Sequence, residues 1–169
     1  FAIGEYLEAA GVDIPVFVSG TLVDLSGRTL SGQTTEGFYA SIRHAKPMCV
    51  GLNCALCAQH MVPFVKRLAG VVECFMHVYS NAGLPNAMGG YDQGGPEMAE
   101  DVRPFCEEGL VNAIGGCCGT GPEHIAAIKA MADSYSPREK HGVDDVMRLS
   151  GLEPLNYVPD ESNMRSTFL

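Results

Sequence analysis

Four short apolar runs alternate with amphipathic stretches along most of this chain. The runs predicted as strands are residues 16–18, 48–52, 71–78 and 110–114. Each is followed, after a loop of variable length, by a stretch whose apolar residues recur every three or four positions, which is the period of a helix with one buried face. Four consecutive strand–helix units predict an α/β fold with a parallel sheet.

Predicted helices lie near residues 34–45 and 58–69, and a third carries Met98, Val102 and Phe105. The helix after the fourth strand has the clearest start signal. Thr120 is expected at its N-cap, and Glu123 three positions later completes a capping pattern. The residues expected to point inward from this helix are Ile125, Ile128 and Ala132.

The apolar strands must be covered on both faces, which leaves a doubly wound sheet or a closed (β/α)8 barrel. We favour the TIM barrel because Cys54, Cys117 and Cys118 follow predicted strands, and such a barrel keeps its active site at the carboxyl ends of its strands. Four units are half of a barrel of about 250 residues. We therefore expect the last four strand–helix units of a barrel in residues 1–136, and a linker in residues 137–169.

Cys117 and Cys118 are adjacent and framed by glycines. Neighbouring side chains on a regular strand point to opposite faces, so two such sulfurs converge only where the backbone is flexible. With Cys54 they would form a three-thiolate zinc site whose fourth position is open to water or a substrate. Two ordinary thiols or a vicinal disulfide remain alternatives for the adjacent pair.

The charge and the cysteine count exclude several classes of protein. A formal net charge of -9 argues against a nucleic-acid partner, which calls for basic patches. No apolar run approaches the roughly 20 residues that cross a bilayer, and no signal-peptide pattern is visible, so we expect no membrane partner and a cytoplasmic location. The seven cysteines are expected as thiols and ligands rather than as a disulfide framework.

Five short segments occur in order along the chain, at residues 19–21, 27–35, 51–56, 81–86 and 115–120. The third reads Gly-Leu-Asn-Cys-Ala-Leu and the fifth Gly-Gly-Cys-Cys-Gly-Thr. Together they resemble the homocysteine-binding domain of cobalamin-dependent methionine synthases. Residues 148–156 resemble the connection of those enzymes to their folate-binding barrel.

The resemblance implies an enzyme that transfers a methyl group from methylcobalamin to homocysteine and forms methionine. It implies zinc on Cys54, Cys117 and Cys118, with Asn81 in the open zinc position when substrate is absent. It also implies cobalamin- and folate-binding modules of the same polypeptide as partners, with cobalamin bound outside this chain. Zinc with three thiolates has a net charge of about -1, so a homocysteine thiolate bound there stays nucleophilic.

Cys57 departs from this family, which usually has glycine there. Because Cys54 and Cys57 form a C-x-x-C pair, a redox pair or a closed four-cysteine zinc module remains an alternative; we favour the open site. A homocysteine methyltransferase that uses betaine or S-methylmethionine is the closer alternative, against which residues 149–156 argue. The side chains expected in the core or on the surface rather than as ligands are Cys49, Cys74, Cys106, His60, His77 and His124.

Overall fold

The computed structural model describes residues 1–142 and 146–157, without the side chains of Cys54 and Ala55. Its centre is a parallel sheet of four strands in the order β1-β2-β3-β4. The strands are β1 (Phe17–Thr21), β2 (Cys49–Cys57), β3 (Phe75–Asn81) and β4 (Ala113–Gly116). The helices that follow them are α2 (Thr35–Ile42) with the short η1 (Arg43–Ala45), α3 (Ala58–Ala69), α4 (Gly95–Glu107) and α5 (Pro122–Ala132). This is the predicted α/β alternation of a partial (β/α)8 barrel.

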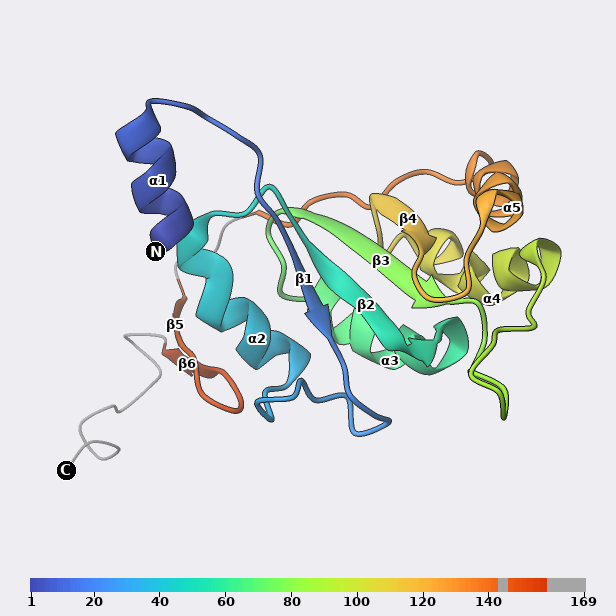
Figure 1. Cartoon of the computed structure of the whole chain (residues 1–169). Helices are drawn as coiled ribbons and strands as arrows, with labels where there is room; N and C mark the ends of the chain where they lie inside the picture. The colour runs from blue at the N-terminus through green and yellow to red at the C-terminus, as the bar shows by residue number, and fades with distance from the viewer. Residues whose placement is uncertain (143–145, 158–169) are drawn as a thin grey trace.

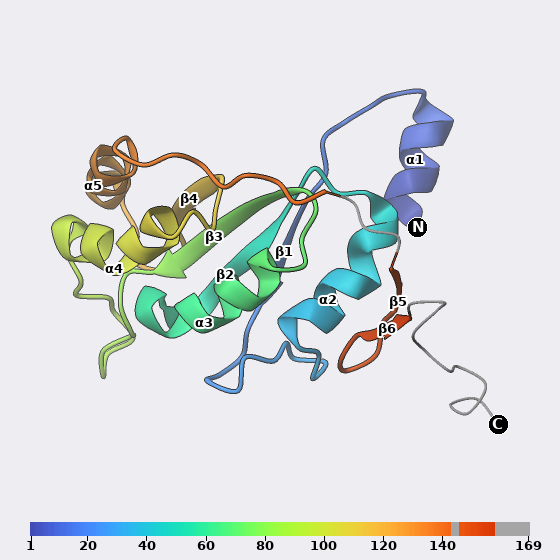
Figure 2. The ribbon, with the colours of Figure 1, turned by 180° about the vertical axis from the view of Figure 1, so that it is seen from behind.

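The helices cover one face of the sheet. Figure 2 shows α2, α3 and α4 in front of the strands, and Figure 1 views the molecule from the opposite side. Side chains of β2 and β3 that face the helices are fully buried, among them Val50, Leu52, Met76 and Val78. On the other face Phe17 is 55% exposed, so this face is only partly covered within the described residues.

Helix α3 has the predicted bounds, whereas the start of α5 differs from the prediction. Its N-cap is Gly121 and not Thr120, because the Thr120 hydroxyl donates instead to the Cys117 carbonyl in the preceding loop. The Gly121 N–H donates to His124 Nδ1 at 3.0 Å, so His124 and not Glu123 takes the role of capping partner. Ile128 is buried as expected, but Ile125 is 46% exposed.

Two strands begin later than predicted. β3 begins at Phe75 rather than at residue 71, and β4 at Ala113 rather than at residue 110. The apolar residues before them are in connections, where Val72 and Val111 are buried in the core. β2 is longer than predicted and reaches Cys57, with a register shift against β3 between Asn53 and Cys57.

Three short elements were not predicted. Helix α1 (Ala2–Ala10) precedes the sheet, and strands β5 (Met147–Leu149) and β6 (Leu155–Tyr157) form an antiparallel hairpin. The hairpin is in the region predicted as a linker, of which residues 143–145 and 158–169 lie outside the described residues. Within the described ranges, every helix is too short or too polar to cross a bilayer.

Candidate active site

Cys117 and Cys118 lie in the loop directly after β4, and their sulfur atoms are 3.9 Å apart. Two thiolates on one tetrahedral zinc, each about 2.3 Å from the metal, would be separated by about 3.8 Å. The loop is fixed to the end of β3, since the Cys117 N–H donates to the Ser80 carbonyl at 2.7 Å and the Ala82 N–H donates to the Cys118 carbonyl at 2.9 Å. The spacing of the pair therefore fits a shared metal ion.

Gly119 gives this loop its shape. Its φ is 78°, a left-handed conformation that residues with a Cβ rarely adopt. A Cβ added there would also lie 2.3 Å from the Cβ of Tyr91. The turn that brings the two cysteine sulfurs together thus requires glycine at this position.

Asn81 is the last residue of β3 and only 3% exposed. Its side-chain oxygen accepts a hydrogen bond from the Cys118 N–H at 3.2 Å. The structure therefore brings Asn81 to the cysteine loop, where it orients the backbone of Cys118. Turn formation, the commoner role of Asn in such a sequence, does not account for this contact.

Cys54 lies in β2, within the stretch where the register against β3 shifts, and its side chain is outside the described part of the structure. Cys57 ends the same strand, and its sulfur is 3.2 Å from His60 Nδ1. Among the side chains that the structure describes, no three His, Cys, Asp or Glu are grouped as a metal site. The three-cysteine set that includes Cys54 stays a prediction.

A polar cluster that the sequence analysis missed lies beside Cys54. Asn53 pairs in register with Thr21 of β1, and its side-chain oxygen accepts hydrogen bonds from Ser19 at 2.7 Å and Thr21 at 3.4 Å. These residues occupy alternate positions of their strands, on the face away from the helices. The sequence signal that could have revealed this cluster is the presence of polar residues at alternate positions near the ends of apolar strands.

His77 lies deeper on the same face, 1% exposed, with its ring stacked on Tyr79 at 4.6 Å between centroids. Burial lowers the pKa of His77 to about 4, so the imidazole is neutral at physiological pH. Cys49 is 3.3 Å from its Nδ1, and burial raises the pKa of Cys49 to about 11. Cys49 is a core residue, as predicted. His77 is also buried, but its Nε2 has no hydrogen-bond partner among the described residues, whereas a surface or hydrogen-bonded core position was expected.

The family model described as homocysteine S-methyltransferase matches residues 2–132. The chain belongs to the homocysteine S-methyltransferase family. The matched range contains the whole parallel sheet, the polar cluster at Asn53 and the cysteine loop, and it ends before the β5–β6 hairpin. The match confirms the methyltransferase family that the sequence predicted, whose reaction is methyl transfer to homocysteine.

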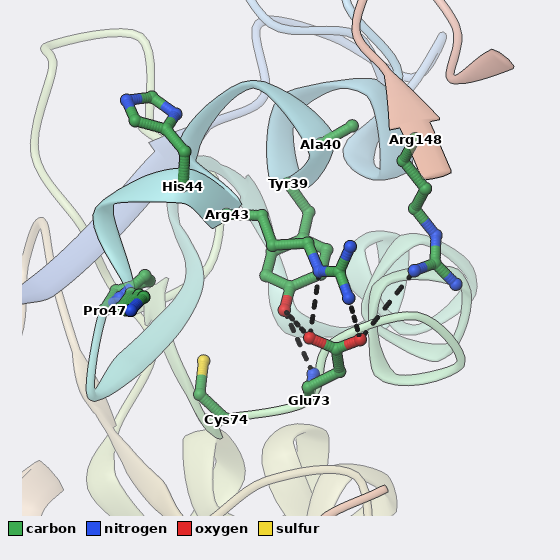
Figure 3. A pocket seen from close by; sticks show the side chains of 9 residues that line it. Tyr39, Ala40, Arg43, His44, Pro47, Glu73, Cys74 and Arg148 are labelled. Carbon is green, nitrogen blue, oxygen red and sulfur yellow. Dashed lines mark hydrogen bonds and ion pairs between the residues drawn. The ribbon is translucent and has the colours of Figure 1, made fainter. Parts of the chain in front are cut away.

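A second cluster of charged side chains in this homocysteine S-methyltransferase domain is at the other end of the sheet. A cavity of about 580 Å³ lies beside the segments that lead into β2 and β3. There the Glu73 carboxylate accepts hydrogen bonds from Arg43 at 2.6 and 2.9 Å and lies 3.8 Å from Arg148 (Figure 3). Because barrel chemistry takes place at the carboxyl ends of strands, we assign this cluster a structural role.

Proposed function

We propose that this domain binds zinc through Cys54, Cys117 and Cys118 and methylates homocysteine as part of a cobalamin-dependent methionine synthase. The observation that carries the proposal is the pair of cysteine sulfurs 3.9 Å apart at the end of β4, in a chain of the homocysteine S-methyltransferase family. When bound, zinc would lower the pKa of the homocysteine thiol and supply a thiolate nucleophile at neutral pH.

The chain's own residues prepare this site. The contact of Asn81 with the Cys118 N–H and the left-handed turn at Gly119 keep the two cysteine side chains convergent. The side-chain oxygen of Asn53 accepts a hydrogen bond from Ser19, and its side-chain nitrogen, which bonds to none of the described residues, could donate to a substrate on this face of the sheet.

Methylcobalamin as the donor is supported by residues 148–156, which resemble the connection of methionine synthases to a folate-binding barrel. This segment lies beyond the range that matches the family model. We propose that cobalamin- and folate-binding modules of the same polypeptide are the partners of this domain and that cobalamin is bound outside this chain.

X-ray absorption on the zinc-loaded full-length protein tests the metal site. We expect three sulfur ligands and one light ligand without homocysteine, and four sulfurs when homocysteine is bound. Four sulfurs in both samples would contradict the open site and identify Cys57 as a ligand.

A methyl-transfer assay with three donors tests the type of enzyme. Methionine should form with methylcobalamin and not with betaine or S-methylmethionine. Methionine formation with betaine or S-methylmethionine, but not with methylcobalamin, would show that the protein is a homocysteine methyltransferase of the kind that uses those donors.

A further inference from the structure

The β5–β6 hairpin (residues 147–157) packs along helix α2, on the side away from β2 (Figure 1). Its first strand reaches the amino end of the sheet, where Arg148 approaches Glu73 (Figure 3). Its turn reaches the opposite end, beside the β1–α2 loop (residues 22–34). The hairpin thus spans the distance between the structural cluster and the end of the sheet that holds the cysteines.

Three polar contacts join the turn of the hairpin to the β1–α2 loop. The Thr34 N–H donates to the Leu152 carbonyl at 2.8 Å, the Gln33 side chain donates to the Gly151 carbonyl at 3.1 Å, and Arg28 pairs with Glu153 at 2.9 Å. Two of these bonds are to backbone carbonyls, so they depend on where the hairpin backbone lies rather than on its side chains.

Gly37 shows how closely the hairpin approaches α2. A Cβ added at this glycine would lie 2.9 Å from the Leu152 carbonyl oxygen. Glycine inside a helix is less favourable than alanine, and the approach of the hairpin backbone accounts for its presence here. The lack of a side chain at residue 37 thus allows the hairpin backbone to lie this close to α2.

The β1–α2 loop in turn forms one wall of a cavity at the carboxyl end of β1. This cavity is about 480 Å³ and is lined by the end of β1, by Phe38 and by the loop residues Thr29, Leu30, Ser31 and Gln33. Thr21 belongs both to its lining and to the polar cluster at Asn53, which directly precedes Cys54. A shift of the loop would therefore change the surroundings of the candidate active site.

We propose that the β5–β6 hairpin holds the β1–α2 loop in the shape that homocysteine binding requires, which makes Gly151, Leu152 and Glu153 positioning residues for the reaction. The proposal rests on the proposed function, and it extends the active-site architecture to residues outside the family match at 2–132.

The decisive variant is Gly37→Ala in the full-length protein, with Gly4→Ala as the matched control. Both replace a helical glycine, but a Cβ at Gly4 would meet nothing within 4 Å. We expect Gly37→Ala to displace the hairpin, to accelerate hydrogen exchange of the Thr34 amide, and to raise the KM for homocysteine about tenfold with kcat nearly unchanged. Gly4→Ala should leave all three quantities unchanged.

Glu153→Ala provides a second, milder test. Glu153 is on the surface, so its removal does not threaten folding, and loss of its pair with Arg28 should raise the KM about two- to fivefold. An unchanged KM in a Gly37→Ala protein with an exposed Thr34 amide would refute the positioning role, as would a raised KM in a variant whose Thr34 amide keeps its full protection. Failure of the wild-type protein to bind homocysteine would refute the proposed function instead, and the Thr34 exchange would still report on the hairpin.

Discussion

Five of the cysteines whose side chains the structure describes are in two kinds of environment. Cys117 and Cys118 are partly exposed in a glycine-bounded loop, whereas burial raises the pKa of Cys49, Cys74 and Cys106. The second group stays protonated at neutral pH and serves packing. Cys49 and Cys106 are buried as their apolar neighbours in the sequence predicted, whereas Cys74, also expected in the core, is only half-buried and packs against it.

Replacing Cys117 or Cys118 by Ser in the full-length protein should abolish zinc retention and methyl transfer while the barrel stays folded, because neither side chain is part of the hydrophobic core. Cys57→Gly is the matched control and should keep its zinc, since its sulfur contacts His60. Zinc content after dialysis against a chelator measures the effect, and circular dichroism checks the fold. Full zinc occupancy in a serine variant would remove that residue from the site.

The buried imidazole of His77 should make the domain sensitive to acid. Its pKa is about 4 in the folded chain and near 6.5 when unfolded, so between these values the unfolded state binds the additional proton. Stability is therefore complete above about pH 6.5 and falls by on the order of 3 kcal/mol as the pH decreases to 4.

Urea unfolding of the dilute chain between pH 4 and 8 would measure this dependence. His77→Phe, which retains a ring to stack on Tyr79, should flatten the curve over the same window. An equal pH dependence of the free energy of unfolding in the wild-type and His77→Phe proteins would show that another group is responsible.

At the scale of helices and strands, the helices were predicted more accurately than the strands. Helix α3 has the predicted bounds because its apolar stripe ends where the helix ends. All four strands of the parallel sheet extend farther toward their carboxyl ends than predicted, because those ends carry polar residues such as Asn53 and Asn81, and glycines, rather than apolar residues. The strand ends consist of the polar and small residues that build the candidate site, so an apolar pattern in the sequence does not show where these strands end.

The segment predicted as the start of a linker is fixed to the domain by Arg138. This side chain is buried and donates to the carbonyls of Ala69, Val72 and Cys74 at 2.6–3.0 Å. Arg138→Ala should lower the free energy of unfolding by about 2–4 kcal/mol because it leaves buried carbonyls without donors. Chemical denaturation measures the loss.

Arg103→Ala is the control for this change. Arg103 pairs with Glu100 of the same helix and donates to the Tyr135 hydroxyl at 3.1 Å. Because these contacts are partly exposed, its removal should lower the free energy of unfolding only slightly. Equal losses of unfolding free energy in the two variants would mean that the burial of Arg138 contributes nothing to stability.

At the scale of the whole molecule, the sheet has one face packed by helices and one face only partly covered by the described residues. β1 and β4 are the edge strands of this sheet, and a closed barrel has no such edges. Exposed edges and exposed apolar side chains favour pairing with other chains.

Residues 1–169 produced alone should therefore associate at micromolar concentration. Phe17→Lys, on the partly covered face, should reduce the association, whereas Leu30→Lys, in the loop after β1 and 91% exposed, should not. Sedimentation velocity separates the outcomes. A chain that remains monomeric, or two variants that behave alike, would contradict a role of this face in association.

The contacts between the hairpin and the β1–α2 loop also set an order of events during folding. The sheet joins strands that follow one another in the chain, while the Arg28–Glu153 and Gln33–Gly151 contacts span 125 and 118 positions. Loop closure over such spans costs more entropy than pairing of successive strands, and during synthesis the hairpin leaves the ribosome after all four strands. We expect the loop to acquire its final shape last, when the sheet beneath it has already formed.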